Sequence, residues 1–186
     1  MSIIFAALQK TLYTWATTNV PNTVPVIWLY PNAPRPNNNG VPVDYVSLLM
    51  SSFVQIGRDW NASPSDNTGL TNFVGDREFT LQVQAYGNTP MQILENLRTS
   101  LQKQSVLSSL QAQGVVYVNW FPILDITDLV DSRYEQRCTM DLLFRLAQQY
   151  SDNLGVISTV EIEEIYKDPA GTVVSDVIVT IPPPTP

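Results

Sequence analysis

The sequence predicts an α+β protein with a mainly antiparallel sheet of about four long strands, helices on one face and a C-terminal β-hairpin. Residues Glu78–Gly87 alternate polar and apolar side chains, and this period of two indicates a strand with one buried face. The apolar residues of the next segment, 90–104, recur instead at helical spacing. Near the C-terminus, two β-rich runs flank Asp168-Pro169-Ala170-Gly171, a combination typical of a hairpin turn.

Three helices are expected, each with an apolar stripe. The first runs from Ser2 to about Thr17, and the third spans residues 105–113. The central helix begins after Thr89, which is expected to cap it, with Pro90 at the first helical position and Gln92 completing a capping box. This helix directly follows the central strand, so we expect the two to form the middle of the fold.

The remaining strands are expected on either side of the central one. They span residues 26–30, 43–57, 115–121 and 133–147, and the polar segment 59–71 is expected to connect two of them as a long loop. Strand 43–57 is apolar on both faces, since Tyr45, Leu49 and Phe53 alternate with a second apolar set. We expect the helices to leave these three residues uncovered, so they are candidates for an interface.

The chain length and its C-terminal composition suggest two parts. Residues 1–155 are long enough for one well-buried core, and residues 156–186 form a hairpin extension with a proline-rich tail. A single hairpin is marginally stable in water. We therefore expect this one to lie on the main domain, on a neighbouring subunit or on a partner protein, extending its sheet.

The overall composition excludes several classes of protein. Ten Lys and Arg stand against seventeen Asp and Glu, a net charge of −7, so no basic face for gripping nucleic acid is expected. No apolar run approaches the ~20 residues of a membrane span, and no secretory signal is visible. The single Cys138 rules out an internal disulfide framework and is interpreted as a small core residue.

The sequence offers little for catalysis. It contains no histidine and no Gly-rich phosphate loop, which removes the commonest general base and the nucleotide-binding motifs. Two acidic sets remain, and they are Asp125, Asp128 and Asp131, and Glu161, Glu163 and Glu164 with Lys167. The first could bind a divalent cation and the second is weakly similar to a nuclease core, but we interpret both as solvated faces. No catalytic, cofactor or metal site is therefore expected.

Several short segments taken together resemble one family. They are Val74-Gly75-Asp76-Arg77-Glu78-Phe79-Thr80, Gln84-Ala85-Tyr86-Gly87 and Ile93-Leu94-Glu95-Asn96-Leu97-Arg98, with further likeness at Arg35-Pro36, Tyr45-Val46, Ile56-Gly57 and residues 131–137. In order and spacing this set is similar to the neck terminator proteins of tailed phages, also called tail terminator or tail-completion proteins. No single segment is a chemical fingerprint, so the order of the set carries the resemblance.

The resemblance implies a virion structural protein rather than an enzyme. Such a protein caps the tail tube and joins tail to head as a homo-oligomeric ring, usually a hexamer, around the DNA channel. Its implied partners are the tail tube protein and the head-side connector, while DNA passes without specific binding and no membrane is involved. It would be assembled in the host cytoplasm and reside at the head–tail junction of the virion.

Charged residues in the resembling segments are further interface candidates. They are Asp76, Arg77, Glu78, Arg133, Glu135 and Arg137, and they join Tyr45, Leu49 and Phe53 as the expected subunit interface. The same charges could instead form cross-strand ion pairs within one subunit.

Two alternative functions remain open at this level. One is a different phage component, such as a head-side connector or a baseplate protein. The other is a small metal-dependent nuclease built on the acidic sets, which magnesium-dependent DNA cleavage would reveal.

Overall fold

The computed structural model describes residues 5–29, 36–38, 41–62, 69–130, 133–153, 155 and 160–181. The chain divides into two units. The first comprises Met1–Trp60 and Val74–Gln149, and the second comprises Asn61–Phe73 and Tyr150–Pro186. Predictions made for residues 2–4, 30–35, 63–68, 131–132, 156–159 and 182–186 concern positions outside the described residues.

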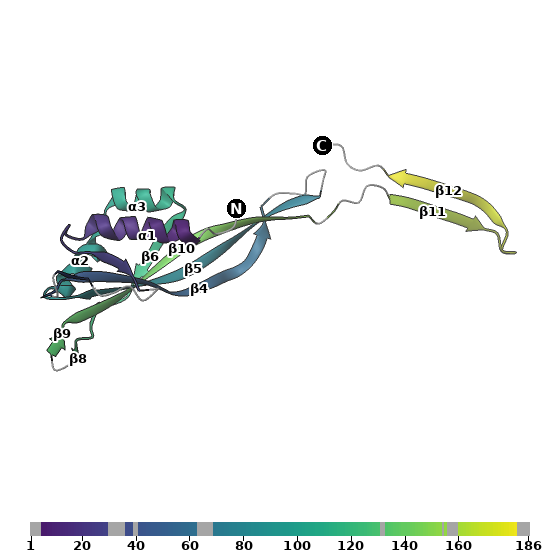
Figure 1. Cartoon of the computed structure of the whole chain (residues 1–186). Helices are drawn as coiled ribbons and strands as arrows, with labels where there is room; N and C mark the ends of the chain where they lie inside the picture. The colour runs from purple at the N-terminus through teal and green to yellow at the C-terminus, as the bar shows by residue number, and fades with distance from the viewer. Residues whose placement is uncertain are drawn as a thin grey trace. The chain divides into compact units, whose positions relative to one another are not determined.

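Helices and strands follow one another along the chain as shown in Figure 1. They are α1 (Phe5–Asn19), β1 (Val26–Trp28), β2 (Asn37–Asn38), β3 (Val41–Pro42), β4 (Tyr45–Asn61), β5 (Leu70–Tyr86), α2 (Pro90–Ser100), α3 (Gln104–Ala112), β6 (Val115–Trp120), β7 (Leu124–Asp125), β8 (Asp128–Val130), β9 (Arg133–Glu135), β10 (Arg137–Asn153), β11 (Val160–Lys167) and β12 (Val173–Ile181). No helix of the described part is long and apolar enough to cross a membrane.

The main sheet has the strand order β1-β4-β5-β10-β6, and β7 also pairs with β10. Strand β1 runs parallel to β4, and β6 runs antiparallel to β10. Hydrogen bonds from Arg77 to Gln148 and from Arg145 to Glu78 show that β5 and β10 are antiparallel, because position rises on one strand as it falls on the other. The α+β class and the mainly antiparallel sheet are thus confirmed. Three strands of 17 residues dominate the sheet, rather than about four long ones.

The three helices cover one face of this sheet (Figure 1), and the core lies between them. Its centre is a row of rings crossing four strands, formed by Phe53 of β4, Phe79 of β5, Phe144 of β10 and Tyr117 of β6. The ring centroids of Phe79 and Phe144 are 5.5 Å apart, and Trp15 of α1 meets Phe144 edge-on at 6.3 Å. The Trp15 indole N–H donates to the Ser100 hydroxyl of α2, so the one polar atom of this ring is satisfied.

The placement of Phe53 corrects the expectation that Tyr45, Leu49 and Phe53 share the uncovered face. The Phe53 ring contacts both Phe79 and Phe5 of α1, so it lies on the helix side. Val46 and Leu48 also lie in the core. In a strand that alternates strictly, these even-numbered residues and Phe53 would point to opposite faces. Alternation in β4 therefore shifts by one residue between Leu48 and Phe53, as a bulge or similar irregularity produces.

The central helix begins where expected but without the expected cap. Pro90 occupies the first turn of α2, while the Thr89 side chain makes no capping hydrogen bond. The Gln92 amide donates to Asn96 along the helix instead of turning back to the N-terminus. The prediction of a capping box is therefore wrong. Burial of the Ile93, Leu94 and Leu97 side chains holds this helix on the sheet instead.

Two expected boundaries are also wrong. The segment 59–71 is not a loop throughout, because β4 continues to Asn61 and β5 begins at Leu70. The expected strand 133–147 is divided into β9, which pairs with β8, and β10. Within the expected strand, alternation groups Tyr134 with the buried residues of β10, but Tyr134 lies exposed on β9 because its segment leaves the main sheet.

The second unit contains the ends of the long strands and the C-terminal hairpin. Phe73 stacks on Tyr150 with ring centroids 5.4 Å apart, and the Ser151 hydroxyl donates to Asn72. Strands β11 and β12 pair antiparallel as a two-stranded sheet. The Gly171 N–H donates to the Asp168 carbonyl, so the expected β-turn and hairpin are confirmed.

We predict that Phe79→Ala will lower the free energy of unfolding by about 3–5 kcal/mol, because its ring is fully buried between two others. Phe121→Ala is the matched control, since that ring is 48% exposed and should change stability by no more than about 0.5 kcal/mol. Denaturant unfolding of both variants measures the difference. Equal losses would mean that the ring row is not the centre of the core.

Candidate interaction surface

The sheet face opposite the helices, here called the polar sheet face, is lined by side chains of β4, β5 and β10. Tyr45 of β4 stacks on Tyr86 of β5 with centroids 4.3 Å apart and planes inclined by 5°. The Tyr86 hydroxyl donates to Gln84 at 2.6 Å, and the Gln84 amide donates to Gln82. The Arg137 guanidinium of β10 lies 5.8 Å from the Tyr86 ring centre, within cation–π range. The stacked rings thus join β4 to β5 on this face, and the Arg137 contact joins β10 to β5.

A row of three buried polar atoms runs along β10 on the same face. Arg137 Nε, Thr139 Oγ1 and Asp141 Oδ1 are shielded from solvent and have no hydrogen-bond partner within the described residues. The three residues are spaced two apart, so their side chains point to one side of the strand. A buried polar atom without a partner costs free energy, on the order of 1–3 kcal/mol. Such a row is uncommon, because about 90% or more of the buried polar groups in folded proteins have a hydrogen-bond partner.

Farther along the polar sheet face the charges are paired within the subunit. Arg145 Nε of β10 donates to Glu78 Oε2 of β5 at 2.9 Å, and the Ser52 hydroxyl of β4 donates to Thr80 of β5. The Arg145 side chain is half exposed, so this ion pair is worth no more than about 1 kcal/mol. It fixes the side chains across the strands rather than stabilising the fold strongly.

The strongest ion pair lies on the other side of the sheet. The Arg77 guanidinium contacts both carboxylate oxygens of Asp59, at 2.7 and 2.8 Å, and these side chains are only 9% and 11% exposed. Arg77 Nε also donates to Gln148 of β10 at 2.8 Å, so one side chain joins three strands. Gly75 provides the space, because a Cβ there would lie 1.8 Å from the Asp59 carboxylate and 2.5 Å from Arg77. The pair is therefore a structural clamp within the subunit.

The structure separates the expected interface residues into groups. Tyr45, Glu78 and Arg137 lie on the polar sheet face, and alternation places Leu49 and Asp76 there as well. Phe53 and Arg77 lie on the helix side of the sheet instead, where Phe53 contacts Phe5 and Arg77 pairs with Asp59 of the same subunit. Glu135 belongs to β9, and the side chain of Arg133 lies outside the described part. Thr139 and Asp141 were not among the expected interface residues, although the alternation of the sequence places both on the outward side of the strand.

The first acidic set is used for local turns. Both the backbone N–H and the hydroxyl of Thr127 donate to Asp125, and these bonds lower the pKa of that carboxyl. Asp128 accepts from the Leu129 N–H, and Asp131 lies outside the described residues. Across the described residues no group of three or more His, Cys, Asp or Glu side chains could hold a metal ion.

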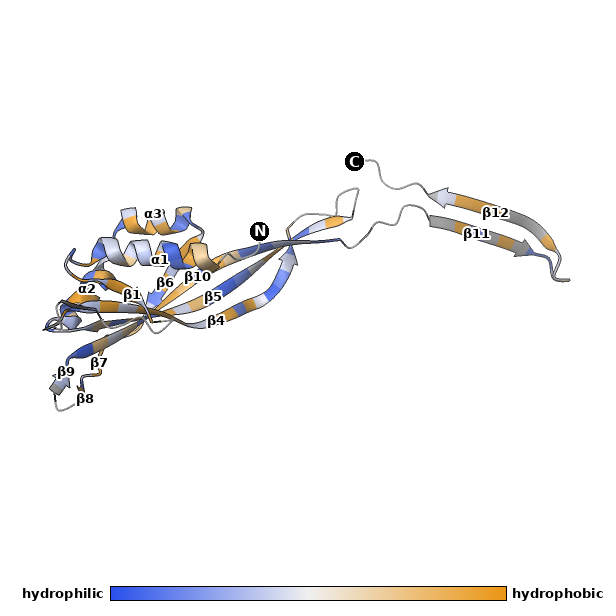
Figure 2. Ribbon diagram, in the orientation of Figure 1, coloured by the Kyte–Doolittle hydropathy of each residue, from blue (hydrophilic) through white to orange (hydrophobic). Residues whose placement is uncertain are grey.

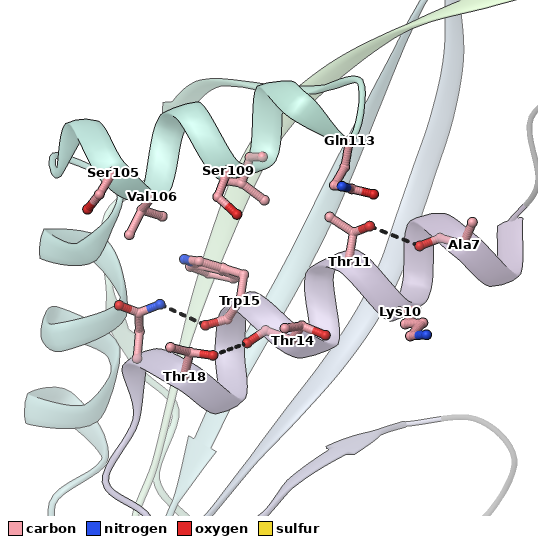
Figure 3. Close-up of a pocket in the computed structure, with 12 residues that line it drawn as sticks. Ala7, Lys10, Thr11, Thr14, Trp15, Thr18, Ser105, Val106, Ser109 and Gln113 are labelled. Carbon is pink, nitrogen blue, oxygen red and sulfur yellow. Dashed lines mark hydrogen bonds between the residues drawn. The ribbon is translucent and has the colours of Figure 1, made fainter.

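A groove of about 630 Å³ lies between α1 and α3 (Figure 3). Its walls carry hydroxyl side chains, but the Thr11 and Thr18 hydroxyls donate to carbonyls one turn back in α1. Lys10 is the one charged residue among those lining it. The described residues that line the groove include no Asp, Glu, His or Cys.

The sequence model of a family described as phage neck terminator protein matches residues 6–174, and the chain belongs to this family. No curated protein matches it in sequence. Membership confirms the resemblance found in the sequence and makes the chain a structural protein of the phage neck, which implies a place in the virion and contacts with other head or tail proteins.

We predict that Arg77→Met will destabilise the subunit by about 3–5 kcal/mol, because it leaves the nearly buried Asp59 carboxylate without its bidentate partner. Arg145→Met removes the same side chain from an exposed pair and should cost about 1 kcal/mol or less. Thermal and denaturant unfolding compare the two. A similar loss in both variants would show that Arg77 is no clamp.

Proposed function

We propose that this chain caps the tail tube and joins the tail to the head as a ring, with six copies around the DNA channel. The observation that carries this proposal is the family match across residues 6–174, which covers both the helices and the main sheet. The tail tube protein and the head-side connector are its partners at the two sides of the ring. Assembly takes place in the host cytoplasm, and the ring remains at the head–tail junction.

The polar sheet face is proposed as a contact between neighbouring copies in this ring. Its accessible side chains include Arg145 of β10, which is half exposed and paired with Glu78, and Val116 of β6, which lies opposite Arg145 and is 43% exposed. A closed ring requires a heterologous contact, in which one surface meets a different surface of the next copy. Charged and apolar groups of that second surface would meet these accessible side chains.

The charge of the chain supports a passage for DNA rather than a DNA-binding site. A net charge of −7 gives no counterion release on meeting phosphates, which is the main source of nonspecific affinity for DNA. A ring through which the genome moves is served by this lack of attraction, because DNA is not held as it passes.

A map of intact virions tests the position and the contact together. We expect six copies at the head-proximal end of the tail, with the polar sheet face buried between copies. A map that places the chain at the baseplate or the portal would support the alternative phage functions and overturn the terminator role. A map with this face open to solvent in every copy would overturn the contact alone.

Ser52→Lys places a charge on the proposed contact at an exposed position of β4. We expect a subunit whose melting temperature changes little, and a phage preparation in which full heads and tails remain unjoined. Thr14→Lys, at an exposed position of α1 on the helix side of the sheet, is the matched control and should leave joining unchanged. Electron microscopy counts joined and separate particles, and normal joining by the first variant would contradict the contact.

We also predict no nuclease activity. The chain lacks histidine, and the turn-forming roles of Asp125 and Asp128 leave no carboxylate poised on a metal in the described part. Incubation with single- or double-stranded DNA and Mg²⁺ or Mn²⁺ should give no cleavage above background. Cleavage that disappears in Asp128→Ala or Glu161→Ala would overturn the structural role.

A further inference from the structure

Strand β6 forms one border of the main sheet and is apolar on both sides. It pairs with β10 along one edge, and within the described residues no strand pairs with its other edge. Val116 lies opposite Arg145 and so shares the polar sheet face, where it is 43% exposed. Tyr117 lies opposite Phe144 and packs on the core. An apolar strand with one unpaired row of N–H and C=O groups is a ready acceptor for another strand.

Strand β12 has the matching character. Its sequence Val-Val-Ser-Asp-Val-Ile-Val-Thr-Ile is apolar at positions of both parities, a pattern typical of strands inside a sheet. In the described part it pairs with β11 alone, and Val177, Ile178 and Val179 are exposed. Figure 2 shows this hydrophobic stretch along β12. Strand β11, by contrast, carries three glutamates, so β12 is the side of the hairpin that favours burial.

The charge of the chain is concentrated in the second unit. That unit holds one lysine against seven Asp and Glu, a net charge of −6, whereas the first unit holds nine Lys and Arg against ten Asp and Glu, a net charge of −1. Two hairpins approaching one another would bring like charges together, and a hairpin approaching DNA would meet a polyanion. The nearly neutral first unit of another copy carries no such repulsion.

We propose that β12 of one copy adds to the free edge of β6 in a second copy, giving the strand order β10-β6-β12-β11 across the contact. The nine residues of β12 are enough to cover the six of β6. Backbone hydrogen bonds hold the added strand, and the apolar side chains of both strands become buried, as in other β-strand additions. The acidic β11 then forms the new edge and faces water, where its charge discourages further pairing.

In this arrangement the partner of β12 is a second copy of the same chain. Each chain supplies one donor strand and one acceptor edge, so copies join head to tail and every donor in a closed ring finds an acceptor. The inference rests on the proposed ring and specifies its contact.

Cysteine cross-linking of the full-length chain tests the pairing. A Val116→Cys chain is mixed with a Val177→Cys chain that carries a mass tag, both at high protein concentration, and a short bismaleimide is added. Both positions are 43% exposed, so neither substitution disturbs the core. Cys138 can remain, because burial and the nearby Asp125 charge raise the pKa of its thiol and keep it unreactive. We expect a product with the summed mass of one tagged and one untagged chain.

Two matched pairs control for chance encounters. Tyr13→Cys on α1, 39% exposed, replaces the β6 position, and Ile162→Cys on β11, 44% exposed, replaces the β12 position. The β6–β12 pair should link several-fold more than either control. Equal yields in all three pairs, or no linked product with Val116→Cys and Val177→Cys, would overturn the proposal.

Charge substitutions separate strand addition from simple electrostatic attraction. Val116→Lys and Val116→Glu both place a charge beside the added strand and should both abolish the cross-link when introduced into the acceptor with Val118→Cys as the linking site. A stronger link with the lysine variant would mean that attraction to the acidic hairpin, not strand pairing, brings the copies together. If the β6–β12 cross-link does not form while a virion map still shows the chain as a ring at the tail end, the proposed β6–β12 pairing is wrong and the proposed function stands.

Discussion

The row of rings across β4, β5, β10 and β6 is the interaction on which the rest of the structure depends. Phe79 and Phe144 are fully buried at its centre, and Trp15 of α1 packs against Phe144 from the helix layer. Large rings bury much apolar area at a small cost in side-chain entropy, so a few of them fix both the order of the strands and the seat of the helix. The register of the long strands, and hence every side chain on the opposite face, follows from this row.

Because the row uses one face of the sheet, the side chains of the opposite face are not part of this core. The same strands that bury Phe79 and Phe144 inward carry Gln82, Gln84, Arg137 and Thr139 outward. The Asp59–Arg77 clamp adds rigidity on the helix side of the sheet, where Gly75 leaves space for it. A surface built on strands held in this way is more precise than one built on loops.

The charge division between the two units gives the chain two different kinds of surface. The first unit is nearly neutral, and the ion pairs of its described part include those of Arg77, Arg98 and Arg145. The second unit is acidic and carries the exposed apolar strand β12. Two such acidic hairpins repel one another, because pairing would bring like charges together. The same repulsion does not oppose the addition of one hairpin to an uncharged sheet edge.

The sequence by itself determined the α+β class, the central strand and helix, the C-terminal hairpin and the family, since these depend on local periodicity and on the order of short segments. It did not determine the face of Phe53, because one irregular step in β4 reverses the alternation and only packing against Phe5 and Phe79 reveals it. Nor could it show that Arg77 is an internal clamp, because its partners Asp59 and Gln148 lie 18 and 71 residues away. The row of partnerless atoms on β10 likewise required the tertiary structure, since burial and hydrogen bonding depend on what the neighbouring strands bring beside each side chain.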